Sequence, residues 1–158
     1  MPAVIVGIFS YIYAMTIAID FDGTIVEHRY PHIGKEIPFA VLTLKTLARE
    51  GHKLILWTVR EGELLDEAVS WCRERGLEFF AVNRDFPDAS DEPTDGCRKL
   101  RVDMFIDDRN LGGIPDWGAI YEVVHENLTF AEYYKRILSA EPEPEPTFWQ
   151  KLFGRKSE

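Results

Sequence analysis

Cysteine is scarce in this chain: only Cys72 and Cys97 occur, and they do not form a C-x-x-C pair. So few cysteines exclude a disulfide framework and fit the reducing cytoplasm, where we expect the protein to be located. Basic residues are also in the minority, with 18 lysines and arginines against 27 aspartates and glutamates and a formal net charge of −9. This acidic balance argues against non-specific binding to nucleic acid, although it leaves room for a locally basic groove. We expect no sequence-specific binding to nucleic acid.

Charged side chains are missing from residues 1–19. An apolar run of this length would normally indicate a membrane span, which needs about 20 residues. Residues 16–19 are needed, however, as the strand that carries Asp20, and the remainder is too short to cross a bilayer. A secretory signal is disfavoured as well, because no basic segment precedes the run. We therefore expect residues 1–14 to be an apolar extension upstream of a native domain that begins at Met15.

Length and composition predict one folded domain. The chain has 158 residues, of which 46% are hydrophobic and 28% charged, as in an ordinary soluble globular protein. We place the catalytic domain at residues 15–140 and a stiff Glu-Pro linker at residues 141–147. Residues 148–158 are an amphipathic, basic tail that either docks on a partner or an anionic membrane surface, or is a frayed end. A homo-oligomer remains possible.

The most informative motif is the stretch Ile17–Thr24, an apolar run that ends in Asp20 and Asp22, followed by a glycine and a hydroxyl residue. Side chains alternate between the faces of a strand, so the two aspartates can point the same way at its end. Two adjacent carboxylates repel each other, and folds keep such pairs mainly where a cation or a reaction uses them. Gly23 lets the backbone approach a ligand closely. The alternative is a strand followed by an ordinary Asp/Gly turn.

Later segments place further reactive side chains at the ends of predicted strands. Residues 54–57 form an apolar run that precedes Thr58, and residues 103–106 precede Asp107 and Asp108. Ligands of a parallel α/β sheet bind beyond the carboxyl ends of its strands, where the strand order reverses. The sequence therefore predicts that these side chains converge on one crevice.

This ordered set of motifs resembles the haloacid dehalogenase-like (HAD) superfamily. More narrowly, Glu27–Pro31 together with Ile33–Pro38 resembles its short bacterial members. Asp20–Thr24 matches the first motif, Thr58 the second, Lys99 the third and Asp107–Asp108 the fourth. The resemblance implies a three-layer α/β/α, Rossmann-like domain with a central parallel sheet and no full cap domain. It says almost nothing about the substrate.

The activity that the resemblance implies is hydrolysis of a phosphomonoester through an aspartyl-phosphate intermediate. Asp20 would be the nucleophile and Asp22 the general acid and base. Thr58 and Lys99 would complete the catalytic set by contacting phosphoryl oxygens and offsetting charge, although Arg98 or Arg101 could replace Lys99, or Lys99 could be a surface charge. Phospho-ligand binding without catalysis, and phosphotransfer to an acceptor other than water, remain alternatives.

Mg²⁺ is the cofactor that the same resemblance implies. Charge counting supports a cation independently, because several carboxylates near a phosphate dianion repel one another strongly. The presence of Asp22 favours a phosphatase over the family's metal-free dehalogenases, which lack this residue. The implied metal ligands are Asp20, Asp22 (through its backbone carbonyl), Asp107 and Asp108. The candidate substrate contacts are Gly23, Thr24, Arg60 and Arg109, the two arginines being equally suited to helix-start or surface ion pairs.

Hydrophobic periodicity predicts alternating strands and helices. Residues 24–37 are expected to form a loop beside the site, too short for an independent cap, with His28 and His32 as loop histidines near the substrate. Residues 116–125 fit a helix or a fifth edge strand, and Cys72 should be buried on a helix. The predicted strands are residues 16–20, 53–57, 77–82 and 102–107, and the predicted helices are residues 38–50, 63–75 and 129–138.

Overall fold

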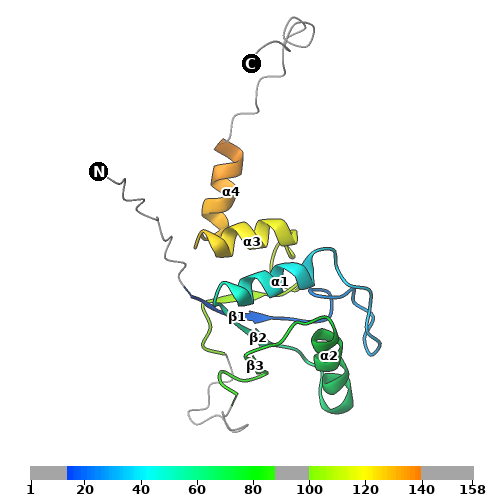
Figure 1. Ribbon diagram of the computed structural model, residues 1–158. Coiled ribbons are helices and arrows are strands. Elements are labelled where there is room, and N and C mark those ends of the chain that lie inside the picture. The colour runs from blue at the N-terminus through cyan, green and yellow to red at the C-terminus, as the bar shows by residue number, and fades with distance from the viewer. Residues whose placement is uncertain (1–13, 88–99, 140–158) are drawn as a thin grey trace, which may run out of the picture. The chain divides into compact units, whose positions relative to one another are not determined.

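Strands and helices alternate along most of the computed structural model, which describes residues 14–87 and 100–139 (Figure 1). The chain divides into two units, residues 1–127 and residues 128–158. The Glu-Pro linker, the tail and residues 1–13 lie outside the described residues. The elements of the first unit are β1 (Thr16–Ile19), α1 (Ala40–Arg49), β2 (Lys53–Leu56), α2 (Gly62–Glu74), β3 (Ala81–Val82), β4 (Met104–Ile106) and α3 (Trp117–His125).

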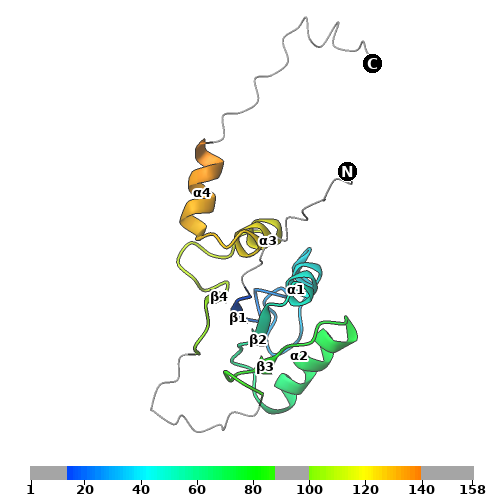
Figure 2. The same ribbon diagram turned by 60° about the vertical axis from the view of Figure 1, so that its left-hand side comes forward.

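A four-stranded, entirely parallel sheet forms the centre of the first unit, in the order β3-β2-β1-β4 (Figure 2). The register aligns Ile19 with Leu56 on one side and with Ile106 on the other. The chain steps from β1 to β2 to β3 in one direction and then places β4 on the far side of β1. The strand order therefore reverses between β1 and β4, which is where a parallel sheet opens a crevice. The predicted α/β class with a parallel sheet is confirmed.

The two faces of the sheet are covered differently. Ile17 and Leu54 belong to the larger apolar cluster, to which α1, α2 and α3 all contribute buried residues, including Cys72. Ala18 and Ile55, on the other face, belong to a smaller cluster. Among residues 14–87 and 100–139, no helix contributes to this smaller cluster, so the described chain supplies one of the two predicted helical layers. The smaller cluster consists of Ala18, Ile55, Ala81 and Leu100, with Trp57, Phe80, Val102 and Phe105 packed against it.

The predicted elements are present, with shifted ends. Residues 77–82 contribute only the short strand β3, because Leu77 still bonds through its N–H to the last turn of α2. Residues 116–125 are a helix and not an edge strand. Residues 24–37 form a loop with two isolated β-bridges and no separate cap, as predicted.

The second unit contains α4 (Phe130–Ser139). A capping box starts this helix: the Glu132 carboxylate accepts hydrogen bonds from the Thr129 N–H and hydroxyl, at 2.7 and 2.8 Å, and the Glu132 N–H donates back to the Thr129 hydroxyl. These bonds lower the pKa of Glu132. Across the described ranges, no helix combines the length and the apolar character that crossing a bilayer requires.

Candidate active site

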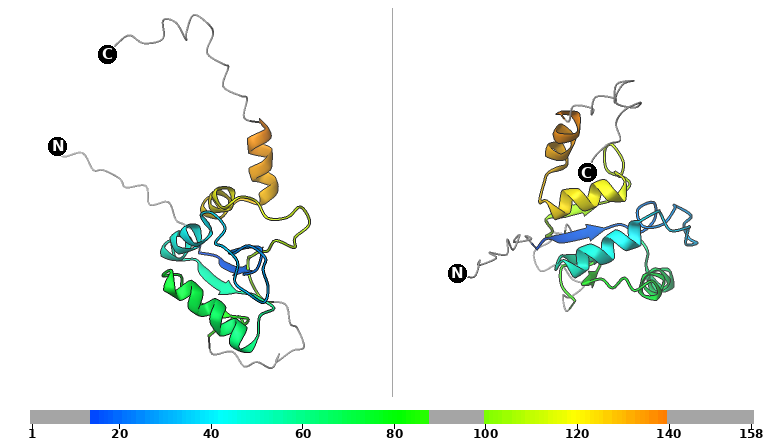
Figure 3. Two further views of the ribbon diagram at one scale, coloured as in Figure 1. Left: turned by 90° about the vertical axis from the view of Figure 1, so that its right-hand side faces the viewer. Right: turned by 45° about the horizontal axis from the view of Figure 1, so that its top comes forward.

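A cleft of about 590 Å³ lies at the carboxyl ends of the strands. The loop of residues 24–37 leaves the carboxyl end of β1 (Figure 3), and its residues His28 and Tyr30 line the cleft. Three strand ends and this loop contribute side chains, as expected for a ligand site at a point of strand reversal. The lining residues are Asp20, Asp22, His28, Tyr30, Trp57, Thr58, Val59, Asp107 and Arg109.

Three of the four predicted metal ligands come together through their side chains. Asp20, Asp107 and Asp108 each offer a carboxylate oxygen, and the three oxygens lie within 4.8 Å of one another. Burial raises the pKa of Asp20 to about 6, and the charges of Asp107 and Asp108 raise it in turn. Oxygen ligands in this number suit a hard divalent cation such as Mg²⁺.

The Asp108 carboxylate supplies an independent sign of a missing positive partner. Its Oδ1 atom is buried and has no hydrogen-bond partner among the described residues. A buried carboxylate oxygen without a donor is costly, and a bound cation removes that cost. Gly23 makes the arrangement possible. Its φ is +94°, and a Cβ at this position would collide with the Asp108 carboxylate, so glycine is the residue that fits here.

Thr24 connects the residues that follow β1 and β4. Its hydroxyl donates to Asp20 Oδ2 at 3.3 Å and accepts from the Asp108 N–H at 3.0 Å. The side chain is completely buried. Thr24 therefore lies behind the aspartates, where it fixes their spacing. It does not line the cleft, which a substrate contact, the role predicted from sequence, would require.

Asp22 is held apart from the three clustered aspartates by a buried arginine. Arg60 donates from Nε to Asp22 Oδ2 at 2.6 Å and from one terminal nitrogen to Asp22 Oδ1 at 2.7 Å. Arg60 is fully buried and Asp22 is 5% exposed. This bidentate geometry is the strongest form of an arginine–carboxylate pair, and it raises the pKa of Arg60.

Arg60 also ties the loop of residues 24–37 to the site. It donates to the carbonyls of Pro31 and His32, at 2.9 and 3.1 Å. Its guanidinium lies 5.2 Å from the centre of the Phe21 ring and 5.4 Å from that of Tyr30. The sequence left Arg60 open between substrate contact and ion pair. The structure shows an ion pair, buried and not on the surface, and Arg60 does not line the cleft.

Thr58 and Arg109 lie where the sequence predicted, at the ends of β2 and β4 and on the cleft wall. The Thr58 N–H donates to Asn83 Oδ1 at 2.8 Å, and the Thr58 hydroxyl accepts from the Arg60 N–H. Asn83 was missed by sequence reasoning, since it lies 25 positions from Thr58 and carries no motif. The Arg109 N–H donates to Asp107 Oδ1 at 2.8 Å. Lys99 and Arg98 lie outside the described residues.

Sequence reasoning did not identify three aromatic or aliphatic residues that line the cleft. Tyr30, Trp57 and Val59 line it, and none of them belongs to the four motifs. Trp57 and Val59 directly flank Thr58, which is the signal that could have identified them. His28, expected near the substrate, lines the cleft, and its Nδ1 is 3.5 Å from the backbone carbonyl of Asp22.

Fold and site together define a parallel α/β protein with a three-aspartate group that could hold a metal ion where the strand order reverses. A solved structure of a conserved protein from Bacteroides thetaiotaomicron is 68% identical, with a TM-score of 0.70, over 77% of this chain and 98% of that chain. The chain belongs to the same family as that conserved protein. Neither a family model nor a curated protein matches it. The sheet and the aspartate group fit the resemblance to HAD-like proteins.

Proposed function

We propose that this protein is a HAD-like, Mg²⁺-dependent phosphomonoester hydrolase that works through an aspartyl-phosphate on Asp20. The observation that carries the proposal is the separation of two kinds of carboxylate in one cleft. Asp20, Asp107 and Asp108 lie together without a positive side chain bonded to them among the described residues, and the buried Asp108 oxygen is unpartnered. Asp22 lines the same cleft, but its negative charge is already balanced by the Arg60 guanidinium.

Each residue then has a defined task. When bound, Mg²⁺ would be held by Asp20, Asp107, Asp108 and the Asp22 carbonyl, and would supply positive charge to the phosphoryl oxygens. Asp20 attacks phosphorus in line, so that the ester oxygen leaves and an acyl phosphate forms. Asp22 delivers a proton to the leaving oxygen and later takes one from the hydrolytic water. Thr58 donates its hydroxyl proton to a phosphoryl oxygen, and Lys99 offsets negative charge.

The test is phosphate release from a panel of phosphomonoesters, with Mg²⁺ and with a chelator. We expect release that needs the metal and that Asp20→Asn abolishes. Asp66→Asn, an exposed aspartate of α2, is the matched control and should retain the wild-type rate. Equal rates in the Asp20→Asn and wild-type proteins would refute the proposal.

A second candidate function is phospho-ligand binding without catalysis. The bidentate pair favours it, because both Asp22 oxygens accept hydrogen bonds from a guanidinium that stays protonated, which restricts their use in proton transfer. This candidate predicts no release from any ester, together with Mg²⁺-dependent binding of inorganic phosphate measured by calorimetry. A cytoplasmic location is part of either proposal, and the described Cys72 is a buried free thiol that fits it.

A further inference from the structure

One face of the Tyr30 ring is held in place, while much of the residue stays exposed in the cleft. The Arg60 guanidinium lies 5.4 Å from the ring centre, and Arg60 is itself fixed by hydrogen bonds to Asp22, Pro31 and His32. Tyr30 is nevertheless 49% exposed and lines the cleft. A ring that a fixed guanidinium braces, and that stays partly exposed in the cleft, is a preorganised surface for a flat ligand group.

The cleft has further apolar lining residues besides Tyr30, and it is larger than a phosphate needs. Trp57 and Val59 line it as well, Val59 being 67% exposed. Ligand sites of about 300–1,000 Å³ hold small organic molecules, and this cleft of about 590 Å³ falls within that range. The three-aspartate group and Thr58 are assigned to the phosphoryl group, so Tyr30, Trp57 and Val59 remain for the organic part of the ester.

The chemistry of the surface favours an unsaturated ring over a saturated or cationic group. The Arg60 guanidinium, 5.4 Å from the centre of the Tyr30 ring, places a positive charge against the ring, so the ring favours an electron-rich partner and disfavours a second cation. We propose that the substrate is a phosphomonoester whose organic part carries a planar unsaturated ring, a nucleobase or an aryl group, that stacks on Tyr30. This inference rests on the proposed phosphatase activity and adds the substrate class to it.

Pairs of esters that differ in the ring of their organic part measure what that ring contributes. A nucleoside 5′-monophosphate and ribose 5-phosphate share the phosphate, the ester oxygen and the sugar, and they differ by the base. Base–aromatic stacking of about 1–3 kcal/mol corresponds to roughly 5- to 150-fold in affinity. We expect kcat/KM for the nucleotide to exceed that for ribose 5-phosphate by about tenfold or more. Phenyl phosphate and cyclohexyl phosphate form the second pair. The pair whose kcat/KM ratio changes more when the Tyr30 ring is removed shows whether the ring of the substrate is a nucleobase or an aryl group.

The variants are Tyr30→Leu and Tyr30→Phe. Leucine keeps apolar bulk but removes the ring, so the nucleotide-to-ribose ratio of kcat/KM should fall about tenfold, whereas phenylalanine should preserve the ratio. Tyr134→Leu is the matched control, since Tyr134 is 54% exposed on α4 and does not line the cleft. Its ratio should equal that of the wild type.

Two results would overturn the inference and leave the proposed function standing: equal kcat/KM for both members of each pair in the wild type, or an unchanged ratio in Tyr30→Leu. Absence of release from every ester would instead refute the phosphatase. Calorimetric binding of the same nucleotide to the wild-type and Tyr30→Leu proteins, with Mg²⁺, would then decide the inference by itself. Tighter binding to the wild type supports stacking, and equal binding refutes it.

Discussion

Asp20 carries an electrostatic cost that can be measured without any substrate. Burial raises its pKa to about 6, above the ordinary value of 3.8, and Asp107 and Asp108 add to the shift. The folded protein therefore binds this proton more tightly than the unfolded chain, so stability falls as the pH rises through 6. At pH 7, with divalent cations chelated, Asp20→Asn should raise the free energy of unfolding by about 1–3 kcal/mol in urea denaturation.

Mg²⁺ supplies the control for that measurement. A ligand that binds only the folded state raises the free energy of unfolding by RT ln(1 + [L]/Kd), so the stability rises with the logarithm of the ligand concentration once the site is filled. The midpoint of the wild-type protein should therefore rise with Mg²⁺ concentration, and that of Asp20→Asn should rise much less. Asp66→Asn should follow the wild type throughout. If the urea midpoint of the wild-type protein did not change with Mg²⁺ concentration, the result would contradict the metal site.

The Asp22–Arg60 pair makes a second prediction at single residues. Removing one partner of a buried ion pair leaves an uncompensated charge, which costs about 3–5 kcal/mol. Arg60→Met should therefore destabilise the fold by about this amount in urea denaturation, and Asp22→Asn in the same chain should recover part of the loss. Additive effects of the two substitutions would show that the pair is not coupled.

At the level of elements, α3 shows what a local pattern leaves undecided. Residues 120–124 are rich in β-branched and aromatic side chains, so a helix and an edge strand fit them equally well. The Asp116 carboxylate decides the start, because it accepts hydrogen bonds from the Gly118 and Ala119 N–H groups. Packing then decides the rest, since Trp117, Ile120 and Val124 are buried and α3 packs against α1.

The Asp116 cap gives the prediction for this element. Asp116→Ala leaves two helix N–H groups without their partner and should cost about 0.5–2 kcal/mol of stability, measured by thermal or urea denaturation. Asp116→Asn keeps an acceptor oxygen in the same place and should cost much less. If both variants lost the same amount, the carboxylate charge and not the hydrogen bonds would hold the start of α3.

The loop of residues 24–37 marks where sequence reasoning stopped. The sequence predicted its length and its position beside the site, because both follow from where β1 ends. Its attachment could not be predicted, since the Arg60 side chain reaches backbone carbonyls that lie 28 and 29 positions earlier. Backbone carbonyls carry no residue-type signal, so no motif announces such a bond. The place of Tyr30 in the cleft depends on the same attachment and was missed with it.

For the whole molecule, the parallel topology explains why widely spaced motifs could be assembled from sequence. Asp20 follows β1 and Asp107 follows β4, and parallel neighbours necessarily present these ends at one edge of the sheet. Alternation predicts which strand residues are buried but not what covers each face. The packing of α1 and α2 on one face follows from the order β3-β2-β1-β4, because right-handed crossovers from β1 to β2 and from β2 to β3 fall on the same face.

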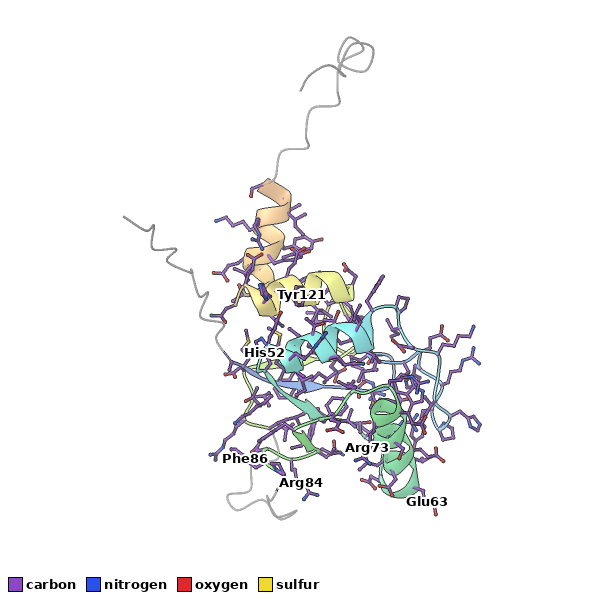
Figure 4. The ribbon with its side chains drawn as sticks, viewed as in Figure 1. His52, Glu63, Arg73, Arg84, Phe86 and Tyr121 are labelled. Atoms are coloured by element: carbon purple, nitrogen blue, oxygen red, sulfur yellow. The ribbon has the colours of Figure 1, made fainter. Side chains whose placement is uncertain are left out.

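His52 links the stability of the whole molecule to pH. It lies between α1 and β2, is 5% exposed, and its Nδ1 accepts a hydrogen bond from the Met15 N–H at 3.1 Å (Figure 4). Burial lowers the pKa of His52; the Glu50 charge opposes this shift, and His125 adds to it. The folded state thus prefers the neutral imidazole, whereas the unfolded chain takes up a proton near the ordinary value of 6.5.

Stability from His52 is therefore complete above about pH 6.5 and is lost as the pH falls below that value toward the lowered folded-state pKa. His52→Asn retains an acceptor for the Met15 N–H but cannot titrate. We expect the wild type to lose more free energy of unfolding than His52→Asn between pH 7.5 and pH 5.5 in urea denaturation. His32→Asn, which changes an exposed loop histidine, should behave as the wild type does. Parallel losses in wild type and His52→Asn would place the pH dependence elsewhere, because the only designed difference between the two proteins is the titratable imidazole that accepts the Met15 N–H.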